Sequence, residues 1–198
     1  MLFLGIDVGT QGARGIVCDE QGKVFAQGTC DFLWLNTSRK EEQYEQDPAM
    51  WWEAVRLAIK KCMDTLWQRG RKPLEIRAVT VDGTSGTVVP LDEKKRPLRD
   101  ALMYNDMRAA EQAVKIHEHA GELEKKMGYV FNASFALPKI LWIKEQEPQI
   151  YKKTKCMVHQ SDYIVGRFTG EYGVTDYSNA LKSGFDMKEE VWPNLLDL

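Results

Sequence analysis

Residues 2–19, LFLGIDVGTQGARGIVCD, determine how the rest of the chain is interpreted. An apolar run ends near Asp7, a glycine-rich turn covers residues 9–12, and a second β-like run continues from Gly15 to Cys18. This order predicts strand, turn and strand. Because glycine has no Cβ, backbone N–H groups in such a turn can converge on a phosphate. A carboxylate one or two residues before the turn can hold Mg²⁺ beside that phosphate, directly or through water.

Two other interpretations of this stretch stay open from the residues alone. Glycine-rich hairpins are common, and an aspartate at the end of a strand often only caps a turn. The regular spacing of Gly9, Gly12 and Gly15 also fits a Rossmann dinucleotide site, which requires a helix directly after the turn. Residues 16–18 are followed by the turn-forming residues 19–22, so the sequence favours a strand at this position over a helix.

Length, composition and charge bound the class of protein. A chain of 198 residues predicts one domain or slightly more, and an apolar fraction of 43% is enough for a sizeable core. A net charge of −2 gives no basic surface for nucleic acid. No apolar run approaches the ~18 residues of a membrane span, and the N-terminus lacks the pattern of a signal peptide. We therefore expect a cytoplasmic protein that binds neither nucleic acid nor membrane.

The four cysteines give no sign of a disulfide framework or a metal site. None belongs to a CxxC pair, and the three histidines are not near them at ligand spacing. Three of the four cysteines lie in apolar segments, which favours reduced, buried thiols. His117 and His119 are two residues apart on an expected helix and share no face, so we expect both on the solvated surface.

The next elements extend the first hairpin into a sheet with a crossover helix. Residues 23–30 alternate after a turn and predict a third, antiparallel strand, whereas residues 33–46 are typical of a loop. Asp47-Pro48 starts an amphipathic helix, and Gly70 ends it. Because this helix crosses over, residues 76–81 are expected to form a strand parallel to the first one.

Glycines and hydroxyls follow the fourth strand at residues 82–86, where the sheet presents its C-terminal edge. Ligands of open α/β sheets bind at such edges. Beyond this point the sequence predicts mostly helices, with two short strands. The expected helices cover residues 107–119, 121–127, 137–147 and 161–168, with Ser161 as N-cap of the last, and the expected strands cover residues 87–92 and 156–158.

Four stretches resemble, in the right order, the motifs of one enzyme family. They are the first hairpin with Arg14, residues 82–89, residues 101–108, and the region from Asp162 to Ala180 with its FTGE and TDYSNA segments. Together they resemble the FGGY carbohydrate kinases, which share a fold with actin and the heat-shock chaperone ATPases. The resemblance covers nearly the whole chain. It implies an α/β, ribonuclease H-like fold with a mixed sheet flanked by helices.

The resemblance also implies roles for individual residues in a kinase that uses ATP and Mg²⁺. Asp7 would organise the Mg²⁺ ion. Hydroxyl, aromatic and carboxylate side chains would line the sugar pocket, since they combine hydrogen bonds with a ring face. Arg14 and Arg108 can equally be surface or ion-pairing residues. The residues implied in phosphate or ATP binding are Gly9, Thr10, Gln11 and Arg14, and those implied in sugar binding are Thr84, Ser85, Tyr104 and Asp106.

Three departures from the family pattern bear on the substrate. Tyr104 stands where the family usually has tryptophan, Thr84-Ser85 replaces the Met-His pair of typical xylulose kinases, and the Arg-Glu pair of glycerol kinases is absent. The DGTSG form of residues 82–86 looks more like the branch that includes D-ribulose kinases. The expected acceptor is therefore a ketopentose or a similar sugar or polyol, with D-ribulose or xylulose favoured.

Residues 1–198 resemble only the N-terminal domain of such a kinase, and an incomplete one. In the family the aspartate that acts as general base lies further along the chain, as does the C-terminal domain with most of the adenine pocket. The resemblance thus implies that the isolated chain is inactive and that its exposed interdomain side favours a homodimer. A non-catalytic member of the superfamily that binds only nucleotide or sugar is the alternative function.

Overall fold

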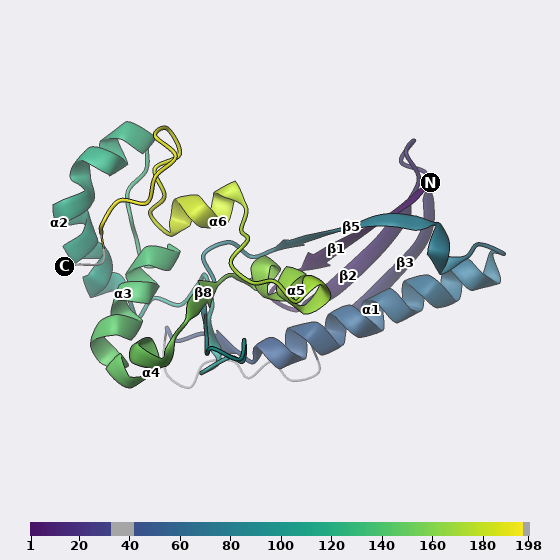
Figure 1. The fold of residues 1–198 in the computed structure, drawn as a ribbon, viewed down its shortest axis with the longest axis horizontal. Helices are drawn as coiled ribbons and strands as arrows, with labels where there is room; N and C mark the ends of the chain where they lie inside the picture. The colour runs from purple at the N-terminus through teal and green to yellow at the C-terminus, as the bar shows by residue number, and fades with distance from the viewer. Residues whose placement is uncertain (33–41, 196–198) are drawn as a thin grey trace.

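A four-stranded mixed sheet forms the centre of the computed structural model, which describes residues 1–32 and 42–195 (Figure 1). β1 (Leu2–Val8) pairs antiparallel with β2 (Gly12–Cys18), β2 pairs antiparallel with β3 (Val24–Asp31), and β5 (Ile76–Gly83) runs parallel to β1. The predicted meander with a parallel fourth strand is confirmed, and the strand after the glycine turn excludes the Rossmann interpretation. In the order of the sheet, the strands are β3, β2, β1 and β5.

Helix α1 (Pro48–Gln68) begins where the sequence predicts and covers one face of the sheet. Asp47 is its N-cap, and the carboxylate accepts a hydrogen bond of 2.8 Å from the N–H of Ala49. A short 3-10 helix (Pro73–Glu75) then leads into β5. The buried face of α1 repeats at three- and four-residue steps and consists, beyond its first residue, of Trp51, Ala54, Val55, Ala58, Cys62 and Leu66.

Glycines let α1 lie directly on β2 and β3. A Cβ atom on Gly28 would lie 2.1 Å from the carbonyl oxygen of Ala58, and one on Gly15 would lie 3.0 Å from Sγ of Cys62. The inward-facing residues of β1 complete this core, and each has an exposed fraction of 4% or less. Because helix and strands meet with so little between them, the sheet and α1 form one closely packed unit.

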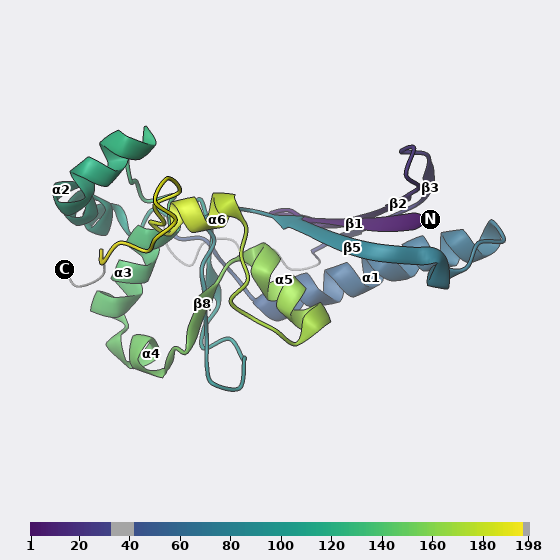
Figure 2. The same ribbon diagram turned by 45° about the horizontal axis from the view of Figure 1, so that its top comes forward.

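The opposite face of the sheet is open in the described part of the chain. Ile16 keeps an exposed fraction of 38%, and Asp7, Arg14 and Thr80 on the same face are exposed as well. Figure 2 shows α1 and α5 (Gln160–Thr169) together on one side of the strands. The uncovered face therefore combines apolar surface with charged side chains near the glycine turn.

The other elements form a mainly helical part beside the C-terminal ends of β1 and β5 (Figure 1). It has an apolar core of its own, in which Phe131, Phe135 and Leu141 pack against Ile116 of the first helix. Helix α5 returns from this part to the sheet and packs against α1 and β5. The helices of the mainly helical part are α2 (Ala110–Met127), α3 (Ala136–Gln146), α4 (Pro148–Lys153) and α6 (Tyr177–Lys182). Its strands form two antiparallel pairs, β4 (Glu45–Gln46) with β7 (Ala101–Leu102) and β6 (Val89–Leu91) with β8 (Cys156–Val158).

Three expectations about these elements are wrong in detail. Helix α2 starts later than expected and continues without a break through Gly121. A glycine inside a helix costs only about 1 kcal/mol, and the buried apolar residues on both sides of it outweigh that cost. His159, not Ser161, is the N-cap residue of α5. Residues 45–46 form β4 instead of a loop, and the other expected loop residues at 33–41 lie outside the described residues.

The expectation about the cysteines is confirmed in part, and the expectation about the histidines is confirmed. All four cysteines are free, but only Cys62 is buried and the other three are half-buried. His117 and His119 are both exposed, and Nδ1 of His117 lies 2.5 Å from Oε2 of Glu124. The described residues contain no group of three side chains placed to hold a metal ion. None of the helices they form is both long and apolar enough to span a bilayer.

Candidate functional site

Hydrogen bonds from several directions hold the turn between β1 and β2 in shape. The N–H of Gly9 donates to the carbonyl of Gly12 at 2.9 Å, across the turn. The carbonyl of Thr10 accepts a hydrogen bond of 2.8 Å from Nε2 of Gln46. The carbonyl of Gln11 accepts one of 2.8 Å from the N–H of Phe32, the residue after β3. A backbone concavity that is fixed in advance suits an anion. The phosphate contacts proposed for this turn stay a prediction.

Asp7 and Arg14 face each other across the hairpin on the open face of the sheet. They are register partners, and Nη1 of Arg14 lies 3.1 Å from Oδ2 of Asp7. Both side chains are at least half exposed, so a ligand can reach them. In the structure Arg14 is therefore an ion-pairing residue, as one of the two interpretations of the sequence predicts. A contact between Arg14 and ATP stays a prediction; Asp7 contacts one nitrogen of the guanidinium, which has further N–H donors.

A second carboxylate, which the motif pattern did not reveal as part of the site, lies next to Asp7. Asp82 is the register partner of Asp7 across the parallel pair of β1 and β5. The two line a hollow of about 460 Å³ together with Arg14 and Thr80. Mg²⁺ is bound in proteins by oxygen ligands, carboxylates above all. The donor set therefore fits the implied cation, with Asp82 as an additional candidate ligand.

The proposed sugar loop continues directly from β5 and is bonded to two helices. The hydroxyl and the N–H of Thr84 both donate to Oε1 of Gln160, the first residue of α5, at 2.7 and 2.9 Å. Nζ of Lys182, the last residue of α6, donates to the carbonyl of Ser85 at 3.2 Å. Thr84 thus anchors the loop to the protein interior, and Ser85 is fixed through its backbone.

Two further segments meet this loop. The N–H of Tyr104 donates to the hydroxyl of Thr87 at 3.2 Å. Gly86 has a φ of +86°, and a Cβ there would lie 2.5 Å from the carbonyl oxygen of Ser134. Three segments that are far apart in the sequence therefore converge. Tyr104 keeps an exposed fraction of 36%, so part of its side chain is accessible to a ligand.

Asp106 follows Tyr104 by two residues and points into the protein interior. The residue is fully buried. Its carboxylate accepts a hydrogen bond of 2.7 Å from the N–H of Tyr44 and hydrogen bonds of 2.8 Å from Nε and Nη2 of Arg108. The Arg108 guanidinium also pairs with Glu45 at 2.7 Å and lies over the ring of Trp142. The ion-pairing interpretation therefore describes Arg108. A direct sugar contact by Asp106 stays a prediction. For such a contact the carboxylate would have to leave Tyr44 and Arg108.

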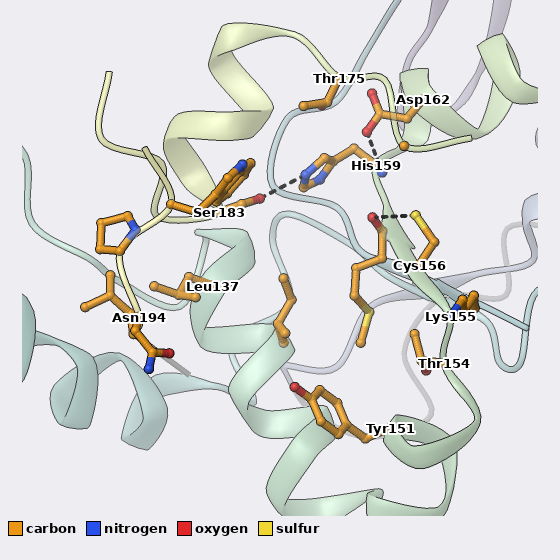
Figure 3. Close-up of a pocket in the computed structure, with 16 residues that line it drawn as sticks. Leu137, Tyr151, Thr154, Lys155, Cys156, His159, Asp162, Thr175, Ser183 and Asn194 are labelled. Carbon is orange, nitrogen blue, oxygen red and sulfur yellow. Dashed lines mark hydrogen bonds between the residues drawn. The ribbon is translucent and has the colours of Figure 1, made fainter. Parts of the chain in front are cut away.

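His159 supports the sugar loop from the wall of a second cavity of about 560 Å³ (Figure 3). Its Nδ1–H donates a hydrogen bond of 2.8 Å to the carbonyl of Thr87. Its Nε2 lies 3.0 Å from the hydroxyl oxygen of Ser183, whose proton is donated to the carbonyl of Asn179. Burial lowers the pKa of His159. Burial raises the pKa of Asp162, whose carboxylate accepts from the N–H of His159. No sequence motif indicated this support.

Comparison with known proteins agrees with the motifs and the geometry. Residues 2–197 match the N-terminal domain of the FGGY family of carbohydrate kinases. Relatives include a xylulose kinase from Escherichia coli, 29% identical over 197 residues that cover 98% of this chain and 39% of that protein. A xylulose kinase from Streptomyces coelicolor is 32% identical over 188 residues, which cover 93% of this chain and 37% of that protein.

The solved xylulose kinase of Rhodospirillum rubrum has a TM-score of 0.86 at 23% identity, over 100% of this chain and 41% of that one. It shares the ribonuclease H-like, actin-type fold, a mixed sheet flanked by helices. The chain spans about two fifths of the length of the curated relatives it matches. Given the match over residues 2–197, the chain belongs to the FGGY family of carbohydrate kinases, to its N-terminal domain.

Proposed function

We propose that this chain is the N-terminal domain of an ATP-dependent sugar kinase, which transfers the γ-phosphoryl group to a hydroxyl of a sugar or polyol. The observation that carries the proposal is the continuity of β5. Asp82 lies beside Asp7 at the glycine hairpin, and two residues later Thr84 begins the loop proposed to bind the sugar. Donor and acceptor would thus meet at the end of one strand, and such positioning is what phosphoryl transfer requires.

Charge stabilisation is the second requirement of this reaction. The carboxylates of Asp7 and Asp82 would hold Mg²⁺, which when bound neutralises charge on the phosphate oxygens. The backbone N–H groups of Thr10 and Gln11 would bind phosphate oxygens, and that of Gly9 would join them on leaving the carbonyl of Gly12. Arg14 would add a cation beside them. These assignments use polar groups that already lie at one end of the open sheet face.

Hydroxyl and ring groups on the acceptor side support a polyhydroxylated substrate. Thr84, Ser85 and Tyr104 lie in the segments that converge at the end of β5, and Asp106 follows Tyr104 by two residues and is buried. The relatives named above are xylulose kinases, which supports a ketopentose such as xylulose, whereas the DGTSG form of the loop favours D-ribulose. Because these relatives are kinases, the non-catalytic alternative is not favoured.

We further propose that the general base and most of the adenine pocket come from chain segments beyond residues 1–198. Residues 1–198 would then be an incomplete N-terminal domain and inactive alone. A homodimer of the isolated chain through the side that would face the missing segments is part of the same proposal. A cytoplasmic location belongs to the same proposal.

A coupled ADP-release assay of the full-length protein with D-ribulose, D-xylulose, glycerol and ATP–Mg²⁺ tests the function. We expect phosphorylation of a ketopentose by the full-length protein and no turnover by residues 1–198. Sugar binding in calorimetry without phosphate transfer would instead favour the binding module. Turnover by the 198-residue chain, purified free of other kinases, would contradict the need for further segments.

A further inference from the structure

A buried ammonium group lies at the point where two walls of the proposed sugar site meet. Lys139, in the first turns of α3, is fully buried. Its Nζ donates 2.5 Å to the carbonyl of Ala133 and 3.2 Å to that of Phe135, and it lies 3.5 Å from the carbonyl of Tyr104. The protonated amine has three N–H donors, one for each oxygen, and the neutral amine keeps two.

These hydrogen bonds connect two segments that are far apart in the sequence. Ala133 and Phe135 flank Ser134, whose carbonyl closely approaches Gly86 of the sugar loop, while Tyr104 comes from the segment after β7. The Tyr104 N–H is itself bonded to the sugar loop. The ammonium therefore lies on the inner side of the place where the loop, Tyr104 and residues 133–135 converge.

Lys139 differs in its environment from a buried lysine held by a salt bridge. Within the described residues no carboxylate forms an ion pair with it, and nearby Asp106 is paired with Arg108 instead. Burial of an ammonium without a carboxylate partner is unfavourable. The hydrogen-bond partners of Nζ are three carbonyl oxygens, so the buried amine and the backbone at these carbonyls hold each other in place.

We infer that Lys139 is a positioning residue of the sugar site, which fixes the Tyr104 backbone relative to residues 133–135 through their carbonyl oxygens. The inference rests on the proposed function for its link to the sugar. Its ligand class is the acceptor, a polyhydroxylated sugar, and not the nucleotide, because Lys139 is bonded to the segments around the sugar loop and not to the glycine hairpin.

The substitution Lys139→Met in the full-length protein tests this role, since methionine keeps the length of the chain but donates no hydrogen bond. We expect the KM for the sugar to rise about tenfold or more, with the KM for ATP changed less than about twofold. The matched control is Lys60→Met on α1, which removes an exposed lysine paired with Asp64 and should leave both constants unchanged. Equal increases for sugar and ATP would overturn the inference.

Hydrogen–deuterium exchange provides a readout that does not depend on activity. We expect faster exchange in Lys139→Met for peptides covering residues 103–107 and 131–137, and unchanged exchange in β1–β3. Unchanged exchange in all of these peptides would overturn the inference, whether or not the protein is a kinase. Absence of transfer to every acceptor by the unsubstituted protein would instead count against the proposed function alone. If Lys139→Met does not fold, Lys139→Gln replaces it, since glutamine keeps two N–H donors. This variant should show the same changes in KM and in exchange to a smaller extent. KM values and exchange rates equal to those of the unsubstituted protein would overturn the inference.

Discussion

Asp7 and Asp82 are register partners at the ends of the parallel strands β1 and β5, so two carboxylates lie side by side on the open face of the sheet. Like charges on neighbouring strands repel each other unless a cation lies between or beside them. Arg14 provides one such cation through its contact with Asp7. A divalent ion would provide another, and it is the one that phosphoryl transfer requires.

The first prediction concerns Asp7. Asp7→Asn in the full-length protein should leave folding near normal, because the side chain is half exposed, and should lower kcat by about 100-fold or more through loss of metal organisation. Steady-state kinetics with a thermal melt measure both. Asp64→Asn on the exposed side of α1 is the control. Near-normal turnover in Asp7→Asn would show that this carboxylate has no part in the reaction.

The second prediction separates Asp82 from Asp7. Asp82→Asn should raise the Mg²⁺ concentration for half-maximal activity by about tenfold, since a neutral amide is a weaker ligand for Mg²⁺ than a carboxylate. The KM for the sugar should stay unchanged. A magnesium titration at saturating sugar and ATP measures the effect. An unchanged titration curve would remove Asp82 from the metal site.

The third prediction concerns the acceptor side. Ser85→Ala and Tyr104→Ala should each raise the KM for the sugar by about tenfold, far more than the KM for ATP, because both residues lie at the proposed sugar loop. Initial-rate kinetics with each substrate varied in turn distinguish the two constants. A comparable rise for ATP would place these residues outside the sugar site.

The fourth prediction tests the packing that positions the hairpin. Gly28→Ala should destabilise the protein by about 2–3 kcal/mol, because the new Cβ would lie 2.1 Å from the carbonyl oxygen of Ala58. Gly121→Ala should instead stabilise by about 0.5–1 kcal/mol, since it lies in a helix with open space around it. Denaturant unfolding measures both. Equal effects of the two substitutions would contradict the close approach of α1 to β3.

The fifth prediction follows from the burial of Lys139, which lowers its pKa to about 7; Asp106 opposes this shift, and Lys182 and Arg108 reinforce it. In the unfolded chain the ammonium keeps its proton up to about pH 10.4. Between these values the unfolded state binds the extra proton, so the Lys139 contribution to stability rises with pH, by up to about 1.4 kcal/mol per pH unit.

Below pH 7 both states are protonated, and the cost of the buried charge is fully present. Thermal melts from pH 6 to 10 should therefore show a positive slope above pH 7 that is smaller in Lys139→Met. Lys60→Met provides the comparison, because Lys60 is exposed and paired on the surface of α1. The same slope in Lys139→Met and in the unsubstituted protein would contradict the shifted pKa.

Local signals allowed the sheet and α1 to be predicted from the sequence. The glycine turn separates two apolar runs, and Asp47-Pro48 with its periodic apolar face specifies the start and orientation of the helix. Gly121 shows the limit of this approach. Its helix-breaking tendency is a local property, whereas the burial that keeps α2 continuous depends on contacts with distant residues.

Candidate site residues could be proposed from the sequence where they lie in a motif, and not where only folding brings them together. Asp7 and Thr84 lie in recognisable motifs. Asp82 becomes a neighbour of Asp7 only through the register of β1 and β5, and register cannot be inferred from either strand alone. The burial of Asp106 and Lys139 likewise arises from segments that meet after folding, since a charged side chain in a sequence is expected at the surface.

The contact between Arg14 and Asp7 places one positive group where, under the proposed function, Mg²⁺ would bind. Mg²⁺ and the guanidinium would then share one carboxylate. The affinity measured for Mg²⁺ alone would include the repulsion between the two cations. A phosphate that arrives with the metal would give Arg14 a second anionic partner. Metal and nucleotide then favour each other's binding, and the hairpin responds to the pair more strongly than to either one.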